Sequence, residues 1–377
     1  MENRRNVAEF FAGIGLVRMG LEEAGWKVVY ANDIDTMKER AYCHHFESNQ
    51  DFHLADVHEV SAGAIPDVEL ATASFPCTDL SLAGRQVGLA GKHSSAFWGF
   101  VEVLNSMGDR RPKLVLLENV EGFLTSHGGE DLEQALLALN ALGYAVDAFI
   151  IDARHFVPQS RRRLFVVGVQ GNCEEQPVTD VSKMRPSKLI NFVQSHPQVK
   201  WCFRQLPPLP ELRSTLSDFV DLLPPEHPEW WNGKRTRYFF SQMSDRHAQV
   251  VDALRNDDHY HYLTAFRRVR YGKSMAEIRS DGIAGCLRTP KGGSARQILV
   301  EVGKGQARVR YMTPSEYAKL MGAGEYRLTG SKTDQLFGFG DAVCVPVITW
   351  IAKNYLNPML EELFIVSATD EANSYAR

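Results

Sequence analysis

The amino-acid sequence predicts an α/β protein whose first half folds as a doubly wound, mostly parallel sheet. Short apolar runs alternate with helix-like stretches from residue 7 to residue 169, at a spacing typical of strands joined by crossover helices. Beyond about residue 171 this alternation stops, and proline-rich runs interrupt the chain. Because 377 residues suffice for two domains, we expect a second domain that is smaller and loop-rich.

The first strand and the first helix show how the elements are identified. Residues 7–11 form a mostly apolar strand, Val-Ala-Glu-Phe-Phe, that ends in a turn at Gly13 and Gly15, and Gly25 closes a helix over 16–24. The same reasoning predicts the other elements of the first half. The expected strands cover 27–31, 69–75, 113–117, 145–151 and 163–169, and the expected helices cover 97–107 and 131–142.

The second half has an irregular part and a regular part. Aromatic and basic residues mix without a clean period between residues 230 and 300. Regularity returns with a helix over 313–321, which opens with a Thr-Pro pair, and with an apolar helix over 341–355.

Charge is distributed unevenly along the chain, although the net charge is only -4. Residues 200–297 hold 16 Lys and Arg against 11 Asp and Glu, so this segment is basic while the rest of the chain is acidic. A basic segment of this kind is typical of a surface that binds a polyanion. A solvated surface that is basic without a partner explains the charge alone equally well.

The six cysteines and the apolar runs bound the class of protein. The cysteines are widely spaced and contain no Cys-x-x-Cys pair, so we expect neither a zinc site nor a disulfide framework, and no metal cofactor. No run of 18 apolar residues occurs, and no apolar core of signal-peptide length follows the two arginines near the start. We therefore expect no membrane span and a cytoplasmic, nucleoid-associated location.

The ends of the predicted strands carry the residues suited to chemistry. In open α/β sheets, ligands bind beyond the carboxyl ends of the strands. Four such ends carry the glycine pair Gly13 and Gly15, the carboxylate of Asp33, the thiol of Cys77 and the carboxylate of Glu118. We expect these residues to converge on one crevice.

The glycine turn indicates an adenosine-containing cofactor. Gly13 and Gly15 allow a ligand close to the backbone, whereas Arg18 stands where a dinucleotide fingerprint requires a third glycine. Asp33 is placed to bind ribose hydroxyls, and Asp56 to accept the adenine amino group. An adenosine ligand without a pyrophosphate favours S-adenosylmethionine over NAD, although the glycine pair by itself also fits an ordinary tight turn.

Three sequence features suit catalysis on a planar substrate. Cys77 follows a strand directly, where a thiol can become nucleophilic, although a structural thiol is the simpler interpretation of one cysteine. Glu118 supplies a carboxylate at a neighbouring strand end. Arg161 and Arg163 share one face of the following strand and can hold an oxygen-bearing ring; a basic surface turn is the alternative.

Six motifs in order make the chain similar to the DNA (cytosine-5)-methyltransferases of bacteria and phages. They read FAGIG, PCTDLS, ENV, QSRRR, RTPKGGSARQ and GFGDAV, and the resemblance covers the chain except about 175–280. It implies a Rossmann-like, S-adenosylmethionine-dependent methyltransferase fold. It further implies a catalytic and cofactor-binding domain over 1–185, completed by 303–377, and a target-recognition domain over 186–302.

The resemblance implies a role for each catalytic candidate. Cys77 would attack carbon 6 of cytosine, and Glu118 would protonate or hydrogen-bond the ring nitrogen. Arg161 and Arg163 would hold the cysteine loop and the base oxygen. Carbon 5 would then take the methyl group, leaving S-adenosylhomocysteine, and the target base would have to be flipped out of the duplex.

The resemblance also implies which residues bind the cofactor. Phe11 would stack on the adenine, the glycines would lie near the methionine part, and the last motif would return to the same crevice. Family members usually carry Asn where this chain has Asp341, and an aromatic residue where it has Ile34. The expected cofactor residues are Phe11, Gly13, Gly15, Asp33, Ile34, Asp56, Val57, Pro76, Asp341, Ala342 and Val343.

The basic segment coincides with the expected target-recognition domain. Its densest part runs from Phe266 to Lys273, and a second basic cluster runs from Trp230 to Arg237. Arginines can read guanine edges, so we expect base contacts from the first cluster, with phosphate-only contacts as the alternative. The expected DNA-binding residues are Ser81, Asn119, Gln159, Arg267, Arg268, Arg270, Lys273 and Arg288.

The predicted function is methylation of carbon 5 of a flipped cytosine in a specific duplex DNA sequence. We expect a restriction-modification or other host-defence context, a monomer in catalysis, and possible defence partners. The alternative is a transfer-RNA cytosine-5 methyltransferase, which shares the motifs but has a Cys-Phe-Thr signature where this chain reads Cys202-Phe203-Arg204. A catalytically inactive adenosine-binding regulator would be expected to lack Cys77, Glu118 or the arginines of the QSRRR motif, and all of them are present.

Overall fold

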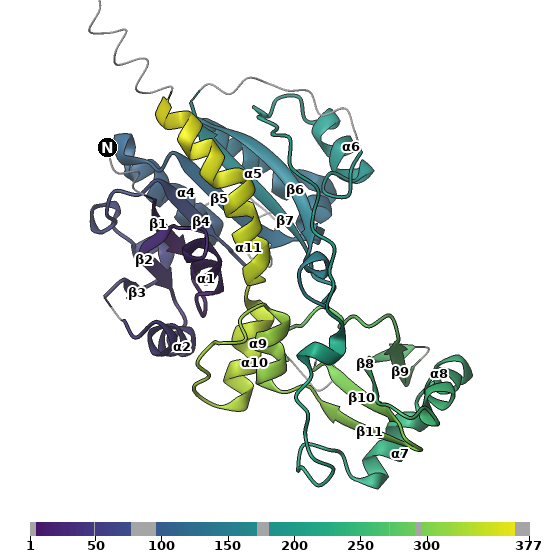
Figure 1. Cartoon of the computed structure of the whole chain (residues 1–377). Helices are drawn as coiled ribbons and strands as arrows, with labels where there is room; N and C mark the ends of the chain where they lie inside the picture. Colours follow the sequence, from purple (N-terminus) through teal and green to yellow (C-terminus); the bar gives the residue numbers. More distant parts are fainter. Residues whose placement is uncertain are drawn as a thin grey trace, which may run out of the picture. The chain divides into compact units, whose positions relative to one another are not determined.

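The computed structural model describes residues 5–48, 50–76, 96–171, 181–270, 272–290 and 296–365. It contains two compact units (Figure 1). Unit 1 comprises Met1–Ile151, Arg162–Pro208 and Val345–Arg377, and unit 2 comprises Asp152–Arg161 and Leu209–Cys344.

Unit 1 is built on a seven-stranded sheet with the order β3-β2-β1-β4-β5-β7-β6. The first five strands in this order run parallel, and β7 runs antiparallel to β5, which confirms the predicted α/β class and mostly parallel sheet. The strands are β1 (Asn6–Phe10), β2 (Lys27–Asp33), β3 (Phe52–Leu54), β4 (Leu70–Ala73), β5 (Leu114–Val120), β6 (Tyr144–Asp152) and β7 (Arg162–Gln170).

Helices cover both faces of this sheet, which explains why β4 and β5 read as almost uninterrupted apolar runs. On one face, Phe10 of β1 packs edge-on against Phe100 of α4. On the other, Phe149 of β6 stacks on Tyr355 of the π-helical turn η7. The helical elements are α1 (Leu16–Glu22), α2 (Thr36–Phe46), α4 (Ala96–Ser106), α5 (Glu130–Ala141), α6 (Ser187–Ser195), α11 (Val345–Ile351) and η7 (Ala352–Leu356).

One apolar helical stretch, Lys332–Ile365, has the length and composition of a membrane-spanning helix. However, 61% of its most apolar window is buried inside the protein. Its α11 part packs on α1, where a Cβ atom at Gly20 would lie 2.7 Å from Ile348. These features are those of a core helix.

The predicted single helix over 341–355 is wrong in one respect. Helix α10 (Lys332–Asp341) ends at Asp341, and Ala342 takes an extended conformation before α11 begins at Val345. Pro346 then lies in the first turn of α11, where a proline is tolerated because its missing N–H has no partner within the helix.

Unit 2 contains a four-stranded antiparallel sheet with the order β11-β10-β8-β9. Its core includes Phe239 of α7, Val251 of α8 and Val300 of β10, so these helices pack on the sheet (Figure 1). The elements are α7 (Gly233–Ser241), α8 (Asp245–Arg255), β8 (His261–Arg270), β9 (Lys273–Arg279), β10 (Ile298–Gly303), β11 (Gln306–Tyr311) and α9 (Pro314–Leu320).

This sheet is more regular than the loop-rich module that the sequence predicts. Its strands do not alternate cleanly because arginine side chains occupy positions that face aromatic rings. Arg267 of β8, for example, lies over the ring of Trp231 with its guanidinium carbon 5.3 Å from the ring centre. The apolar stem of an arginine packs like a hydrophobic side chain there, so the pattern of residue types does not show the period of the strand.

The compact units do not have the bounds of the predicted functional domains. Unit 2 runs over 209–344 and includes 152–161, whereas the predicted target-recognition domain covers 186–302. Compactness and function are different criteria for dividing a chain, so the two sets of bounds need not agree.

One cysteine departs from the expectation that the chain has no disulfide framework. Cys202, which is 1% exposed, is disulfide-bonded. Cys43, Cys286 and Cys344 form no disulfide.

Candidate active site

The carboxyl ends of the parallel strands of unit 1 form one edge of the sheet. The ends of β3, β2, β1, β4 and β5 follow one another along this edge. Because β7 runs antiparallel to β5, its first residues lie at the same edge, where Arg163 pairs with Val120. All the candidate residues of unit 1 that the structure describes lie on or just beyond this edge.

The turn after β1 has an unusual backbone. Phe11 and the glycines Gly13 and Gly15 all have positive φ angles, of 55°, 59° and 82°. A Cβ atom at Gly15 would lie 2.3 Å from the ring of Phe46, so packing requires glycine there. At Gly13 the nearest atom to such a Cβ is 3.9 Å away, so this glycine leaves the backbone open to an approaching ligand.

Asp33 connects this turn to the end of β2. Its carboxylate is buried and accepts hydrogen bonds from the backbone N–H groups of Gly13 at 2.9 Å and Asp35 at 3.0 Å. The ammonium group of Lys38 lies 3.9 Å away. Directly after this buried carboxylate, the side chain of Ile34 is 66% exposed.

Asn32 is a structural part of the site that the sequence analysis missed. It is 1% exposed, and its side-chain amide donates to the carbonyl groups of His53 and Ala55 at 3.0 and 2.9 Å. These bonds hold the loop that leads to Asp56. The signal in the sequence was a polar side chain in a strand that is otherwise buried and apolar.

Asp56 and Val57 follow β3. The Asp56 carboxylate caps the short helix η1 (Val57–Glu59) by accepting from the N–H of His58 at 3.0 Å. Val57 is buried against α4, where a Cβ atom at Gly99 would lie 2.7 Å from it. The position of the Asp56 carboxylate is therefore determined by a well-packed turn.

Glu118 and Arg163 form an ion pair at the other end of the same edge. Oε1 of Glu118 lies 2.9 Å from Nε of Arg163, and both side chains are largely buried. An arginine at this distance determines how the carboxylate is oriented.

Asn119 holds the end of β4 close to β5. Its side-chain amide donates to the carbonyl group of Phe75 at 3.2 Å, and its side-chain oxygen accepts from the N–H of Val120 at 2.8 Å. The chain continues from Phe75 to the exposed Pro76. The next residue, Cys77, lies outside the described residues, as does Ser81.

Glu9 of β1 was also missed by the sequence analysis. It lies two residues before Phe11, is 1% exposed, and its carboxyl oxygens have no hydrogen bond of normal geometry. Burial raises the pKa of Glu9 to about 8, against the opposing effect of Arg18. Glu9 is therefore a mostly neutral acid at pH 7, next to the glycine turn.

Hydrogen bonds within unit 2 tie together segments of three predicted motifs. Arg161 is 2% exposed. Its guanidinium group donates to the carbonyl groups of Leu287 at 2.8 Å, Gly340 at 3.2 Å and Ala342 at 2.6 Å. The fully buried Gln159 accepts from the N–H of Leu287 and donates to the carbonyl of Leu320. These side chains therefore hold the QSRRR, RTPKGGSARQ and GFGDAV segments in place.

The idea of Arg161 and Arg163 as a same-face pair needs correction. β7 begins at Arg162, so Arg161 precedes the strand and the alternation of faces does not apply to it. Arg161 donates to backbone carbonyl groups, while Arg163 pairs with a carboxylate. The two arginines therefore have different surroundings and different tasks.

The last motif is placed at the end of α10. Asp341, the final residue of α10, is exposed, whereas Val343, the final residue of the motif, is buried. A Cβ atom at Gly340 would lie only 2.4 Å from the backbone nitrogen of Thr289, so the backbones pass closely there. Arg288, next to Thr289, is exposed.

The basic strand β8 presents different arginines on its two faces. Arg268 and Arg270 share the carboxylate of Glu277 at 3.5 and 3.1 Å, and both side chains are more than half exposed. Arg267 points to the opposite face, toward the rings of Trp231 and Phe239. Lys273, at the start of β9, is exposed.

Unit 2 also contains a cavity of about 660 Å³ lined by aromatic and basic side chains. Arg235 lies 3.9 Å from the ring centre of Trp231, and Arg296 lies 4.3 Å from that of Tyr311. Such stacked guanidinium groups keep their N–H donors available at the rim. The lining residues are Pro228, Glu229, Trp230, Trp231, Asn232, Arg235, Arg296, Tyr311 and Lys332.

Several known proteins are similar to this chain in sequence. The type II methyltransferase M.DsaV of Dactylococcopsis salina is 36% identical over 176 residues, covering 46% of this chain and 48% of that protein. The DNA-cytosine methyltransferase of Escherichia coli strain K12 is 28% identical over 395 residues, covering 94% of this chain and 78% of that protein. With M.DsaV and with M.BanI, the chain aligns to about half the length of the relative.

Solved structures show the same fold. The Dnmt2 methyltransferase of S. pombe matches with a TM-score of 0.60 and 16% identity, covering 96% of this chain and 99% of that one. A putative DNA modification methyltransferase encoded within an E. coli prophage matches with a TM-score of 0.56 and 17% identity, covering 94% and 99%. A family model described as C-5 cytosine-specific DNA methylase matches residues 5–357. This chain therefore belongs to the C-5 cytosine-specific DNA methylase family.

Proposed function

We propose that this protein transfers a methyl group from S-adenosylmethionine to carbon 5 of a flipped-out cytosine in a specific duplex DNA sequence. One observation carries the proposal. The ion pair of Glu118 with Arg163 lies at the sheet edge where Asn119 donates to the carbonyl of Phe75, two residues before Cys77. A carboxylate oriented in this way, next to a strand end that leads to a thiol, suits addition chemistry on a cytosine ring.

In the proposed reaction, the thiolate of Cys77 forms a bond to carbon 6 of the cytosine. Glu118 hydrogen-bonds or protonates the ring nitrogen, which accepts the electron pair displaced by this attack, and Arg163 keeps Glu118 oriented. Carbon 5 thereby becomes nucleophilic. When bound, S-adenosylmethionine supplies a methyl group on a positively charged sulfur. A base then removes the carbon 5 proton, and those electrons expel the Cys77 thiolate.

The glycine-turn end of the edge fits the adenosine cofactor. The open backbone at Gly13 gives a ligand room, and the buried Asp33 with the exposed Ile34 places a carboxylate beside an apolar surface. These are the groups that ribose hydroxyls and an adenine ring require. We propose that the cofactor is held by Phe11, Gly13, Gly15, Asp33, Ile34, Asp56, Val57, Pro76, Asp341, Ala342 and Val343, and that no metal takes part.

The basic surface of unit 2 supports DNA as the substrate. We propose that Arg267, Arg268, Arg270 and Lys273 contact bases or phosphates and that the aromatic and basic cavity receives phosphate groups. Ser81 and Arg288 are proposed to contact the DNA near the target base. We keep 186–302 as the proposed target-recognition domain, with 1–185 and 303–377 forming the catalytic domain.

Asn119 and Gln159 receive a different proposed role from the one expected. Both are nearly or fully buried, and their side chains already bond to the protein. We propose that Asn119 positions the segment after β4 that leads to Pro76 and Cys77, and that Gln159 positions residues 287–288. Contacts with DNA are left to neighbouring residues.

We infer the biological context from the relatives named as type II methyltransferases. A restriction-modification or other defence role would place the enzyme in the cytoplasm with the nucleoid, acting as a monomer with possible defence partners. Such an enzyme would protect one DNA sequence from cleavage.

Transfer of labelled methyl groups tests the proposal. Purified protein should label unmethylated duplex DNA and leave transfer RNA unlabelled, and bisulfite sequencing of DNA from expressing cells should show one modified sequence. Cys77→Ser should abolish transfer, whereas Cys43→Ser, which changes a free cysteine of α2, should retain it. Labelling of transfer RNA alone would establish the alternative substrate, and an active Cys77→Ser variant would exclude the proposed nucleophile.

A further inference from the structure

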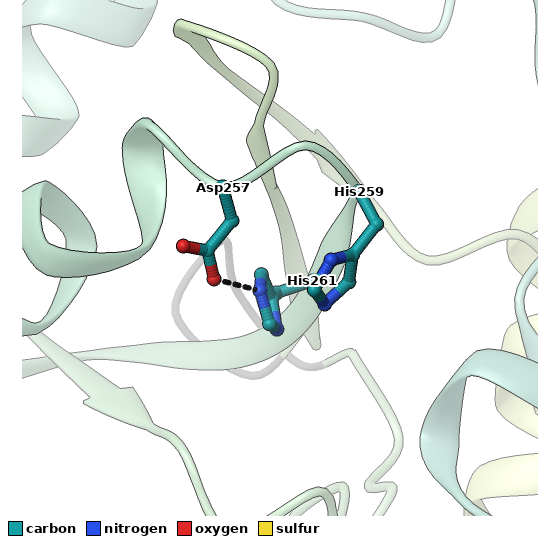
Figure 2. Close-up of side chains that lie close together, drawn as sticks. All are labelled: Asp257, His259 and His261. Atoms are coloured by element: carbon teal, nitrogen blue, oxygen red, sulfur yellow. Dashed lines mark hydrogen bonds and ion pairs between the residues drawn. The ribbon is translucent and has the colours of Figure 1, made fainter.

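Three side chains gather where α8 is followed by β8 in unit 2. Asp257 lies two residues beyond α8, and His259 and His261 follow at alternate positions. Figure 2 shows the two imidazole rings and the Asp257 carboxylate turned toward one another. None of the three belongs to the candidate active site.

Their ligand atoms are close enough to share one ion. One ring nitrogen of each histidine and one carboxylate oxygen of Asp257 lie within 4.8 Å of one another. Nε2 of His261 is 2.6 Å from Oδ2 of Asp257, and the ring centres of His259 and His261 are 4.3 Å apart. In a tetrahedral site with metal–ligand bonds of about 2.0–2.1 Å, ligand atoms are roughly 3.3 Å apart, a value between the 2.6 Å of the Asp257–His261 pair and the 4.8 Å limit for all three atoms.

The backbone that carries these residues is held by the turn between β10 and β11. The N–H of Lys304 donates to the carbonyl of Asp257 at 2.7 Å, and the N–H of Gly305 donates to that of Arg255 at 2.8 Å. A Cβ atom at Gly303 would lie 2.0 Å from the carbonyl oxygen of His259, so the two backbones are in direct contact. The cluster is therefore positioned by long-range contacts and does not belong to a free loop.

Asp258 adds a group typical of the surroundings of a metal-binding histidine. Its carboxylate lies 3.0 Å from Nδ1 of His259 and can accept the proton of that nitrogen. The other ring nitrogen then keeps its lone pair for a cation. Metal-ligating histidines commonly donate their second N–H to a carboxylate in this way.

We propose that Asp257, His259 and His261 form a binding site for one divalent transition-metal ion, with Zn²⁺ as the best fit. Two imidazole nitrogens and one carboxylate oxygen suit Zn²⁺ and its neighbours in the transition series, whereas Mg²⁺ and Ca²⁺ prefer oxygen ligands alone. The site is open to solvent, since His259 is exposed, so water would complete the coordination.

The position of the site implies a structural task. A bound ion would join the end of α8 to the start of β8, the strand whose far end carries Arg267, Arg268 and Arg270. It would thereby stabilise the sheet that we propose to contact DNA, without taking part in methyl transfer.

Titration of the metal-free, full-length protein with ZnCl₂ tests the site. Calorimetry should show one equivalent bound at pH 7.5, and the melting temperature should rise with Zn²⁺ concentration. Binding should weaken in acid, because protons compete with the ion for its nitrogen and oxygen ligands. Absence of any bound equivalent in the wild-type protein would overturn the proposal.

Matched variants separate this site from other histidines. His261→Ala and Asp257→Asn should each weaken binding at least roughly 10-fold, and Asp258→Asn should weaken it less. His127→Ala removes a histidine that also pairs with an aspartate, at 2.8 Å, but has no second histidine in the pair, and should bind Zn²⁺ normally.

Stability is measured with EDTA present to show that the variants fold. If His261→Ala is unfolded, His261→Gln replaces it with a polar side chain that binds the ion poorly. Unchanged affinity in a folded His259→Ala/His261→Ala protein would place the ion elsewhere and refute the site.

Discussion

At the scale of single residues, the pair Glu118 and Arg163 makes the clearest prediction. Glu118→Gln keeps the size of the side chain but removes the negative charge that Arg163 orients at 2.9 Å. Methyl transfer should fall by roughly 10²–10⁴-fold, because the ring nitrogen loses its acid catalyst. Transfer is measured with labelled cofactor on duplex DNA.

Cofactor binding distinguishes this role from a structural one. S-adenosylmethionine should bind to Glu118→Gln as tightly as to the wild-type protein, as measured by calorimetry. A weakened affinity combined with an unchanged rate at saturation would remove Glu118 from the catalytic step.

Glu9 predicts a dependence of stability on pH. Its pKa is about 4.5 when unfolded and about 8 when folded, so the folded protein binds the extra proton between these values. The free energy of unfolding should therefore fall as pH rises from 5 to 8, by an amount on the order of a few kcal/mol. Urea unfolding at several pH values measures this change.

Glu9→Gln should abolish most of that pH dependence, because an amide cannot ionise. Glu130→Gln, which changes an exposed glutamate at the start of α5, serves as the control and should keep it. The assignment to Glu9 would be contradicted if the free energy of unfolding of Glu9→Gln depended on pH between 5 and 8 in the same way as that of the wild-type protein and of Glu130→Gln.

At the scale of elements, the glycine turn after β1 can be tested through packing. Gly15→Ala introduces a methyl group 2.3 Å from the Phe46 ring in addition to a positive φ of 82°. Gly108 has a positive φ of 57° but no atom within 4 Å of an added Cβ. Gly108→Ala should cost about 1 kcal/mol from the backbone alone, and Gly15→Ala should cost about 1–3 kcal/mol more.

Thermal or urea unfolding measures both variants, and the turn predicts a second difference between them. Gly15→Ala should also weaken S-adenosylmethionine binding because the turn must shift to relieve the clash. Equal stabilities for the two variants would mean that the Phe46 ring moves away from the added methyl group at no cost in free energy.

A fully buried ion pair connects the end of β11 to α9. Arg310 and Glu316 have no exposed side-chain surface, and Glu316 also accepts N–H groups from Asp221 and Thr313. Glu316→Ala should lower the free energy of unfolding by about 3–5 kcal/mol, since Arg310 keeps a buried charge without its carboxylate. Arg310→Met/Glu316→Leu should be less destabilised than Glu316→Ala in the same unfolding experiment, and the reverse order would contradict the argument.

At the scale of the whole molecule, the charge distribution predicts how the protein binds DNA. The acidic net charge of -4 opposes binding, so affinity must come from the basic segment. The logarithm of DNA affinity should fall linearly with the logarithm of salt concentration. Fluorescence anisotropy on a labelled duplex gives this slope.

Removal of two basic side chains tests whether the exposed face of β8 binds the DNA. Arg268→Ala/Arg270→Ala removes two exposed side chains of β8 and should reduce the slope by up to about 2. Lys353→Ala, an exposed lysine of η7, should leave the slope unchanged. If Lys353→Ala reduced the slope as much as the double variant, the salt dependence would reflect the overall charge of the protein and not a binding surface on β8.

The order of apolar runs, glycines and polar strand ends determined the main sheet and its candidate edge. These signals are local, because a buried strand needs a continuous apolar run and a helix ends at glycine. The placement of Gly13, Asp33 and Glu118 at one edge follows from parallel strands. The sheet of unit 2 was not predicted, because arginine stems such as that of Arg267 occupy positions where the period would show apolar residues.

Only the tertiary structure could decide what each polar side chain binds. Arg161 and Arg163 look alike in sequence, but one donates to carbonyl groups and the other pairs with Glu118. The buried acid of Glu9 and the cluster around His261 depend on neighbours far along the chain, such as the turn at Gly303. Burial and distance set the charge and the partner of a side chain, and neither is encoded by its immediate neighbours in the sequence.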